Sequence, residues 1–190
     1  MSAWELPTSL QVGGVDLQIR TDFRVILDIL SYFNDPEYEP DEQWAICLDI
    51  LYGDWESIPP EHQQEAMERA IWFINRGKKY DDKQRSFPKL MDWEQDAPMI
   101  ASAINNATGK EIRELEYMHW WTFLDAYMGI GECLFSQVLS IRQKLQKGGV
   151  NKLEKWEKEF YCGNRDIVDL KHKENAEEAA ERAAVDALFG

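Results

Sequence analysis

The sequence predicts a mainly α protein, a helical globule with a small N-terminal β-hairpin and a C-terminal helical arm. Apolar side chains recur at helical spacing along most of the 190 residues, while two short alternating runs flank a glycine pair near the start. Hydrophobic residues make up 44% of the chain, which is enough for one domain to bury a core. We therefore expect a helical domain over residues 1–163 that includes the hairpin, followed by a helical extension over residues 164–190.

The first expected elements are the hairpin and one helix. Residues 9–20 alternate apolar and polar side chains around Gly13-Gly14, a pair that supplies the positive φ angles of a two-residue turn. The apolar period then changes from two to 3.6, so Thr21 or Asp22 is expected to cap a helix. Asn34-Asp35-Pro36 is expected to end it.

Two further helices are predicted before the middle of the chain. Asp41 is expected to cap the first of them and Gly53 to end it, whereas Pro59-Pro60 opens the next and Gly77 stops it. The polar stretch over residues 78–89 predicts an exposed, mobile connector. The side chains of these three helices expected to face the core are Phe23, Ile26, Leu27, Leu30, Phe33, Trp44, Cys47, Leu48, Leu51, Ala66, Met67, Ala70, Ile71 and Ile74.

A second helical cluster is predicted from Leu90 onward. Asp92 is expected to cap a helix through about Asn106, and Pro98 fits that helix only in its first turn or at a bend. An aromatic helix is expected over residues 117–128, and another helix over about residues 132–147. The apolar side chains of the latter are Leu134, Phe135, Val138, Leu139, Ile141 and Leu145.

The end of the chain is predicted to be helical as well. A charged, partly apolar segment spans residues 152–161, and one helix is expected to run from Asn164 towards the end. Its alanine-rich part has high helix propensity, but it has little to bury unless Val185, Leu188 and Phe189 meet a partner.

The formal charge of −14 disfavours some classes of binding partner. Residues 1–60 alone hold twelve Asp and Glu against two Arg. This balance argues against nucleic acid and against an anionic membrane, since both require clustered Lys and Arg. A solvated acidic surface is the preferred interpretation, and steering of a basic partner or mimicry of DNA are the alternatives.

Cysteine usage and hydropathy indicate the compartment. The three cysteines, Cys47, Cys133 and Cys162, form no C-x-x-C pair, which is typical of a reducing cytoplasm, and each is expected to be a small buried hydrophobe. The first twenty residues lack the basic-then-apolar pattern of a secretory signal, and no stretch approaches the ~20 apolar residues of a membrane span. We expect a protein in the cytoplasm.

Motifs for catalysis or metal binding are missing from the sequence. His62, His119 and His172 are far apart, and Gly109-Lys110 lacks the other residues of a phosphate loop. A pairing of Cys133 with His119 as nucleophile and base is an enzymatic alternative, and no motif supports it. We expect no enzyme activity, no cofactor and no metal site.

The densest feature is an aromatic cluster formed by Tyr117, His119, Trp120, Trp121 and Phe123. On a helix, Tyr117, Trp120 and Trp121 would share one face, and His119 could donate a ring hydrogen bond to a buried acceptor. Aromatic side chains this close bury large areas, so a core cluster is the preferred interpretation. A pocket or partner groove is the alternative.

Four strings, taken in order and spacing, carry a resemblance. They are Thr21-Asp22-Phe23-Arg24, Met91-Asp92-Trp93-Glu94-Gln95-Asp96-Ala97, Tyr117-Met118-His119-Trp120-Trp121-Thr122-Phe123 and Lys155-Trp156-Glu157-Lys158-Glu159-Phe160. Together they resemble the bacteriophage gene-product-fifteen (Gp15-like) family of tailed phages and prophages, over roughly residues 5–170. The Glu94-Gln95-Asp96 and His119-Trp120-Trp121 strings are its specific parts, whereas Pro98 and the alanine-rich tail after Leu170 depart from the pattern.

The resemblance implies a phage tail morphogenesis protein without catalytic residues. Family members are similar to tail assembly chaperones, which implies binding of the long, helical tape-measure protein, with the tail tube protein as a further partner, in the cytoplasm of the bacterial host. A structural component of the finished tail is the main alternative. An acidic DNA mimic that inhibits a host protein is a weaker one, and self-association into a homo-oligomer stays open.

Overall fold

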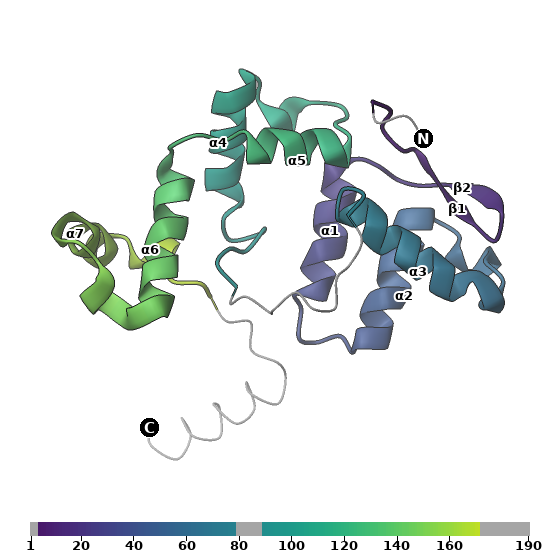
Figure 1. Cartoon of the computed structure of the whole chain (residues 1–190), viewed down its shortest axis with the longest axis horizontal. Helices are drawn as coiled ribbons and strands as arrows, with labels where there is room; N and C mark the ends of the chain where they lie inside the picture. Colours follow the sequence, from purple (N-terminus) through teal and green to yellow (C-terminus); the bar gives the residue numbers. More distant parts are fainter. Residues whose placement is uncertain (1–3, 79–88, 172–190) are drawn as a thin grey trace, which may run out of the picture.

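The computed structural model describes residues 4–78 and 89–171, and within them the protein is mainly α, as predicted. The chain begins with one small antiparallel hairpin and continues through helices (Figure 1). The elements are β1 (Ser9–Val12), β2 (Val15–Gln18), α1 (Phe23–Phe33), α2 (Pro40–Tyr52), η1 (Trp55–Ser57), α3 (Pro60–Ile74), α4 (Ala97–Thr108), η2 (Ile112–Glu114), α5 (Trp120–Met128), α6 (Leu134–Gly148), η3 (Gly149–Lys152), α7 (Lys155–Gly163) and α8 (Arg165–Val168). The expected connector at 78–89 and alanine-rich arm lie almost wholly outside the described residues.

The hairpin forms as predicted. Val12 pairs with Val15 across the turn, and Gly13 and Gly14 have φ angles of +56° and +79°, which a side chain would disfavour. Leu10 and Val12 are buried, and β1 packs on α3, where the Gly13 N–H donates a hydrogen bond of 2.8 Å to the carboxylate of Glu65. This hydrogen bond attaches the tip of the hairpin to α3.

The first two helices begin with acidic caps. Asp22 caps α1 by accepting a hydrogen bond from the Arg24 N–H at 3.0 Å, as expected. The prediction that Asp41 caps α2 was wrong, because Glu39 is the cap residue. The backbone N–H of Glu39 donates a hydrogen bond to the side chain of Glu42, which forms a capping box. Proline is favoured in the first turn of a helix, so α2 begins at Pro40, ahead of the expected cap.

The third helix turns mostly the expected face to the core, with Met67 and Ile74 packed against it, and Phe73 is an additional buried residue. It begins at Pro60 and ends before Gly77, as predicted. Its buried residues are Ala66, Ala70 and Phe73, whereas Ile71 and Ile74 are only half-buried. The small alanines allow close approach of neighbouring elements, and Phe73, which the apolar pattern did not single out, fills the space beside them.

The start of α4 differs from the prediction. Asp96 precedes the helix, whereas the Asp92 carboxylate accepts hydrogen bonds from the N–H groups of Glu94 and Gln95 and so shapes the turn before it. Pro98 therefore lies in the first turn, where its missing N–H costs no helical hydrogen bond.

The aromatic helix is shorter than predicted. His119 caps α5, which begins at Trp120, so Tyr117 lies outside the helix and is 55% exposed. The expectation that Tyr117 shares a helical face with Trp120 and Trp121 was wrong. The reason is the histidine side chain, which accepts a backbone hydrogen bond at a position where the aromatic pattern alone suggests continuous helix.

Between Leu134 and Lys171, where the C-terminal part is described, there are three α-helices rather than the expected two. The predicted α6 ends at Gly148, and the charged segment after η3 becomes α7. The single helix expected from Asn164 onward is interrupted: α8 ends at Val168, and Asp169 is extended.

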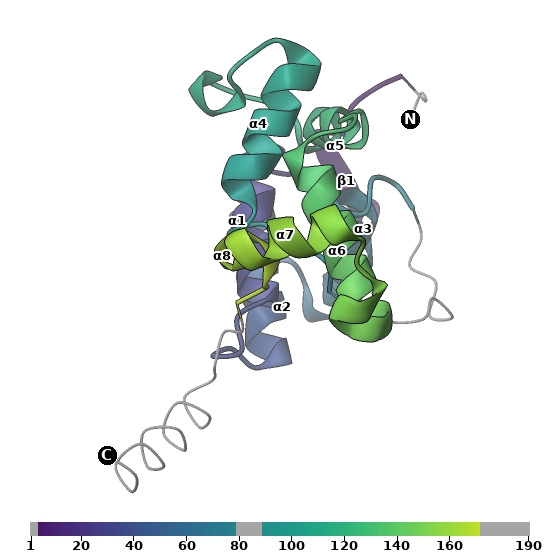
Figure 2. The same ribbon diagram turned by 90° about the vertical axis from the view of Figure 1, so that its left-hand side faces the viewer.

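Two groups of buried side chains hold the fold together. The larger lies among the hairpin, the first five α-helices and Phe135, and the smaller consists of Val138, Ile141, Leu153 and Val168. In Figure 1, α1–α3 and the hairpin lie on one side, α6 and α7 on the other, and α4 and α5 between them. Figure 2 shows α7 and α8 beside α6.

Candidate functional site

The strings at 21–24 and 117–121 meet in space although they are about half the chain apart. The Trp120 N–H donates to the Thr21 carbonyl at 2.7 Å, and the Met118 N–H donates to the Asp22 carboxylate at 3.1 Å. Arg24 continues the junction by donating to the carbonyl oxygens of Leu115 at 2.7 Å and of Ile112 at 3.2 Å. These hydrogen bonds place the start of α1 against the start of α5.

His119 uses both of its ring nitrogens in this junction. Nε2 donates to the Pro7 carbonyl at 2.9 Å, and Nδ1 accepts the Trp121 N–H at 3.0 Å, which requires the neutral ring protonated on Nε2. Burial lowers the pKa of His119 and outweighs the hydrogen bond to Pro7, which acts in the opposite direction. Both nitrogens are engaged by the backbone, so His119 is not placed as a base for Cys133.

We expect His119 to make the stability depend on pH. A histidine whose pKa is lowered by folding contributes its full stability above its unfolded pKa of about 6.5, and this contribution is lost as the pH falls towards the folded pKa. His119→Asn retains a cap acceptor but has no titratable ring, so its free energy of unfolding should vary less with pH just below 6.5 than that of the parent chain. Urea unfolding at several pH values measures this, and identical pH profiles would contradict the assignment.

The aromatic cluster lies mainly in the core. Trp120 and Phe123 are buried, and the Trp120 indole donates to the Ile74 carbonyl at 2.9 Å. Phe123 stacks on Phe23, with ring centroids 4.7 Å apart and an interplanar angle of 6°. Of the expected site residues here, His119, Trp120 and Phe123 are buried, Trp121 is half-buried, and Tyr117 is on the surface.

A buried ion pair lies behind the Glu94-Gln95-Asp96 string. The side chain of Asp96 is 0% exposed and that of Arg142 is 4% exposed, and they form two parallel hydrogen bonds of 2.7 and 2.8 Å. The remaining three guanidinium N–H groups donate to the carbonyl oxygens of Leu90, Ile167 and Val168. All five donors of Arg142 are therefore satisfied, and the guanidinium joins α4, α6 and α8.

Gln95 adds a second connection to the C-terminal segment. Its side-chain amide donates to the Asp169 carbonyl at 2.8 Å and accepts the Lys171 N–H at 2.9 Å. Glu94, by contrast, is exposed. Gln95 and Asp96 therefore hold the fold together, whereas Glu94 lies at the surface.

A hollow of about 270 Å³ lies between α1 and α4, which both pack on α5. We call it the α1–α4 groove. Most of its lining is apolar, and Phe123 of α5 contributes to it. Its lining residues are Phe23, Arg24, Leu27, Trp93, Ala97, Pro98, Ile100, Ala101, Ile112, Arg113 and Phe123.

The polar groups of the groove are two arginines at one end, and each is paired. Arg24 forms an ion pair with Asp22, and Arg113 forms one of 2.7 Å with Glu111. Hydrogen bonds from Arg113 lower the pKa of Glu111 to about 2, so this carboxylate stays charged and balances the arginine at neutral pH. This end of the groove is therefore close to electrically neutral.

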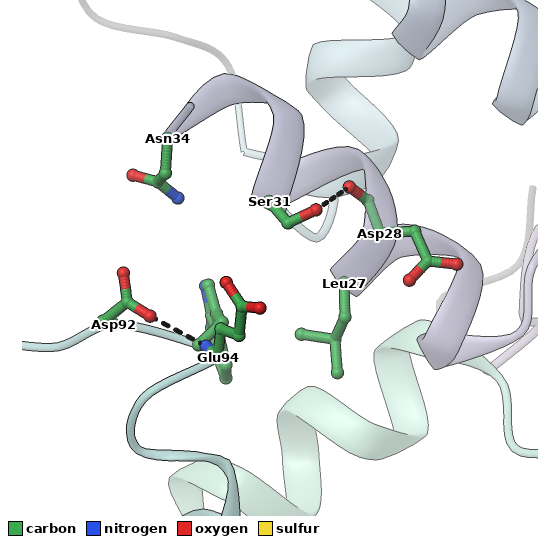
Figure 3. A pocket seen from close by; sticks show the side chains of 7 residues that line it. Leu27, Asp28, Ser31, Asn34, Asp92 and Glu94 are labelled. Carbon is green, nitrogen blue, oxygen red and sulfur yellow. Dashed lines mark hydrogen bonds between the residues drawn. The ribbon is translucent and has the colours of Figure 1, made fainter. Parts of the chain in front are cut away.

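A smaller hollow of about 180 Å³, here called the acidic pocket, adjoins the groove because Leu27 and Trp93 line both. Figure 3 shows Leu27 and Asp28 projecting from α1, and Glu94 facing this helix from the turn before α4. The residues that line the acidic pocket are Leu27, Asp28, Ser31, Asn34, Asp92, Trp93 and Glu94. An apolar groove thus continues into a pocket with three carboxylates.

The cysteines differ in their surroundings, and the expectation that all three are buried was wrong for two of them. Cys47 is buried, and burial raises its pKa to about 12, whereas Cys133 is half-buried and Cys162 is exposed. Among residues 4–78 and 89–171, no group of three His, Cys, Asp or Glu side chains is placed to hold a metal ion. No helix in these ranges is long and apolar enough to cross a bilayer.

A family model described as Bacteriophage Gp15 protein matches residues 4–170. The chain belongs to this family. No match was found among curated proteins or among solved structures. Membership indicates a phage-related structural or morphogenetic role.

The four Gp15-like strings lie within the matched residues 4–170, and the structure shows a residue that sequence reasoning missed. Arg142 was not singled out, although it holds together segments distant in sequence. A signal for Arg142 was present, because it lies at helical spacing between the apolar residues Val138 and Leu145. A charged residue within an apolar stripe indicates a buried partner.

Proposed function

We propose that this Gp15-family chain is a tail assembly chaperone that binds the tape-measure protein in the cytoplasm of the host and performs no catalysis. The observation that carries the proposal is the apolar α1–α4 groove in a member of a phage family. Proteins that bind an amphipathic helix present an apolar groove between their own helices, which receives side chains at helical spacing.

The dimensions of the groove suit a helix rather than a small molecule. The groove and the acidic pocket together follow α1 from Phe23 to Asn34. Eleven residues of α-helix extend over about 16 Å, so an occupant lying along α1 would make contact over about three turns. The high net negative charge keeps such a complex soluble while the rest of a long partner is still unassembled.

Replacing Leu27 by Asp tests the proposal. Leu27 lines both hollows and is half-buried, so the new carboxylate would be desolvated by any apolar occupant. When the tape-measure protein of the same phage is co-expressed, we expect the parent chain to keep it soluble and Leu27→Asp to lower its soluble fraction severalfold.

Val15→Asp is the matched control for this experiment. Val15 is an exposed apolar residue on β2, outside both hollows, so the same change of side chain there should leave the soluble fraction unchanged. A tape-measure protein equally soluble with and without the parent chain would refute the chaperone function. Stoichiometric amounts of the chain in purified tails would instead indicate a structural component.

A further inference from the structure

We infer that Val185, Leu188 and Phe189 of this same chain occupy the α1–α4 groove when no partner is bound, so that a partner has to displace them. The inference deepens the proposed function, because it adds regulation of the same site, and it rests on that function for the identity of the competing partner. It stands on the place at which the described residues end, beside the groove, and on the apolar side chains that follow in the sequence.

The described residues end at the α4 edge of the groove. The side-chain amide of Gln95 holds this end, because it binds the Asp169 carbonyl and the Lys171 N–H. The residues two positions before and two positions after Gln95 both line the groove. Lys171 lines a hollow of about 650 Å³ together with Pro98, which is a lining residue of the groove as well. Residues 172–190 therefore start beside the groove.

The segment is long enough to reach the whole groove. Val185 follows Lys171 by fourteen positions, which span about 20 Å as a helix and at most about 50 Å as an extended chain. The groove is bounded on one side by α1, whose entire length is about 16 Å. The groove is therefore within reach of Val185 of the same chain, whichever conformation the intervening residues adopt.

The chemistry of the segment matches that of the groove. Val185, Leu188 and Phe189 are its three large apolar side chains, and their spacing of i, i+3 and i+4 is that of anchors on a helix that docks in an apolar groove. A cavity of about 150 Å³ accepts one benzene ring, so the groove of about 270 Å³ has room for more than one such side chain. Docking would remove these side chains and the apolar lining of the groove from water together.

The charges of the segment are placed so that they need not enter the groove. Its four glutamates lie at positions 174–181, before the apolar side chains, and Asp186 is the single charged residue over positions 183–189. On a helix, Asp186 lies about 100° around from Val185, the middle of the three apolar residues, and so would stay at the rim in contact with water. Docking therefore avoids the desolvation of a charge.

A labelled peptide with the sequence of residues 174–190 tests the inference by competition. In the full-length variant Val185→Ser/Leu188→Ser/Phe189→Ser, here called the anchor-free variant, the chain's own segment has lost its apolar side chains and leaves the groove open to the peptide. By fluorescence anisotropy, we expect the anchor-free variant to bind the peptide about tenfold more tightly than the parent chain does. The reason is that the tethered segment of the parent chain competes at an effective concentration of about millimolar.

Matched variants locate the binding. The control Ala179→Ser/Ala180→Ser/Ala183→Ser places three serines in the same segment but keeps its large apolar side chains, and it should bind the peptide as weakly as the parent chain does. Leu27→Asp, added to the anchor-free variant, puts a carboxylate in the lining of the groove and should weaken peptide binding at least tenfold. Val15→Asp, added in the same way outside the groove, should leave peptide binding unchanged.

The mass of the chain in solution distinguishes docking within one chain from exchange between two copies. By sedimentation at micromolar concentration, we expect the parent chain and the anchor-free variant to have the same oligomeric state. A parent dimer that becomes a monomer in the anchor-free variant would show that the segment occupies the groove of a second copy, and would overturn the inference.

The outcomes separate this inference from the proposed function. Equal binding of the peptide by the parent chain and the anchor-free variant, or binding that Leu27→Asp leaves unchanged, would overturn the inference even if co-expression shows chaperone activity. A tenfold gain that Leu27→Asp removes, together with a tape-measure protein that gains no solubility from either chain, would support the docking and refute the chaperone function. If both hold, limiting amounts of the anchor-free variant should solubilise more of the tape-measure protein than the same amounts of the parent chain.

Discussion

Arg142→Ala is expected to lower the free energy of unfolding by about 3–5 kcal/mol, because it leaves the buried Asp96 carboxylate without its cation. The loss is large compared with the ~5–15 kcal/mol by which domains of this kind are stable. Three backbone carbonyls, those of Leu90, Ile167 and Val168, also lose their donor. Urea unfolding followed by circular dichroism measures the change.

Two comparisons make this prediction specific. Lys147→Ala removes a cation from the exposed last turn of the same helix and should cost less than about 1 kcal/mol. The double variant Arg142→Met/Asp96→Leu removes both charges, so its destabilisation should be smaller than the sum of the two single replacements. If the effects of the two single replacements on the free energy of unfolding simply added up in the double variant, the ion pair would not act as described. The same conclusion would follow if Arg142→Ala were as stable as Lys147→Ala.

Trp120→Ala is expected to lower the free energy of unfolding by about 3–5 kcal/mol, through the cavity that it leaves. Trp120 is 2% exposed, and its ring lies 5.6 Å from that of Phe123 and 6.1 Å from that of Trp93. The Ile74 carbonyl also loses the hydrogen bond from the indole. The same unfolding experiment gives the result.

Trp156→Ala provides the same chemical change at the surface. Trp156 is 49% exposed on α7. Its indole N–H donates a hydrogen bond of 3.2 Å to the carboxylate of Glu154, which is itself exposed. We expect its replacement to change stability by no more than about 0.5 kcal/mol. Equal effects at the two tryptophans would contradict the interpretation of the aromatic cluster as core.

The candidate site was predictable only in parts. The string around Glu94 was identified from its residues, but its three members turn out to differ, since Asp96 is buried in an ion pair, Gln95 binds the backbone and Glu94 is exposed. The aromatic cluster was correctly expected to be mainly core. The groove itself was not predictable, because α1 and α4 contribute its two walls and are separated by more than sixty residues of chain.

The sequence by itself determined the local geometry: the Gly13-Gly14 turn, the cap at Asp22 and the helix end at Gly53. Each of these depends on the backbone preferences and hydrogen bonds of residues within about four positions of one another, which a single sequence displays directly. Only the tertiary structure decided that Asp96 meets Arg142 across 46 positions. The energy of a charge depends on how far distant segments exclude water from it, and the pattern of neighbouring residues does not contain that information.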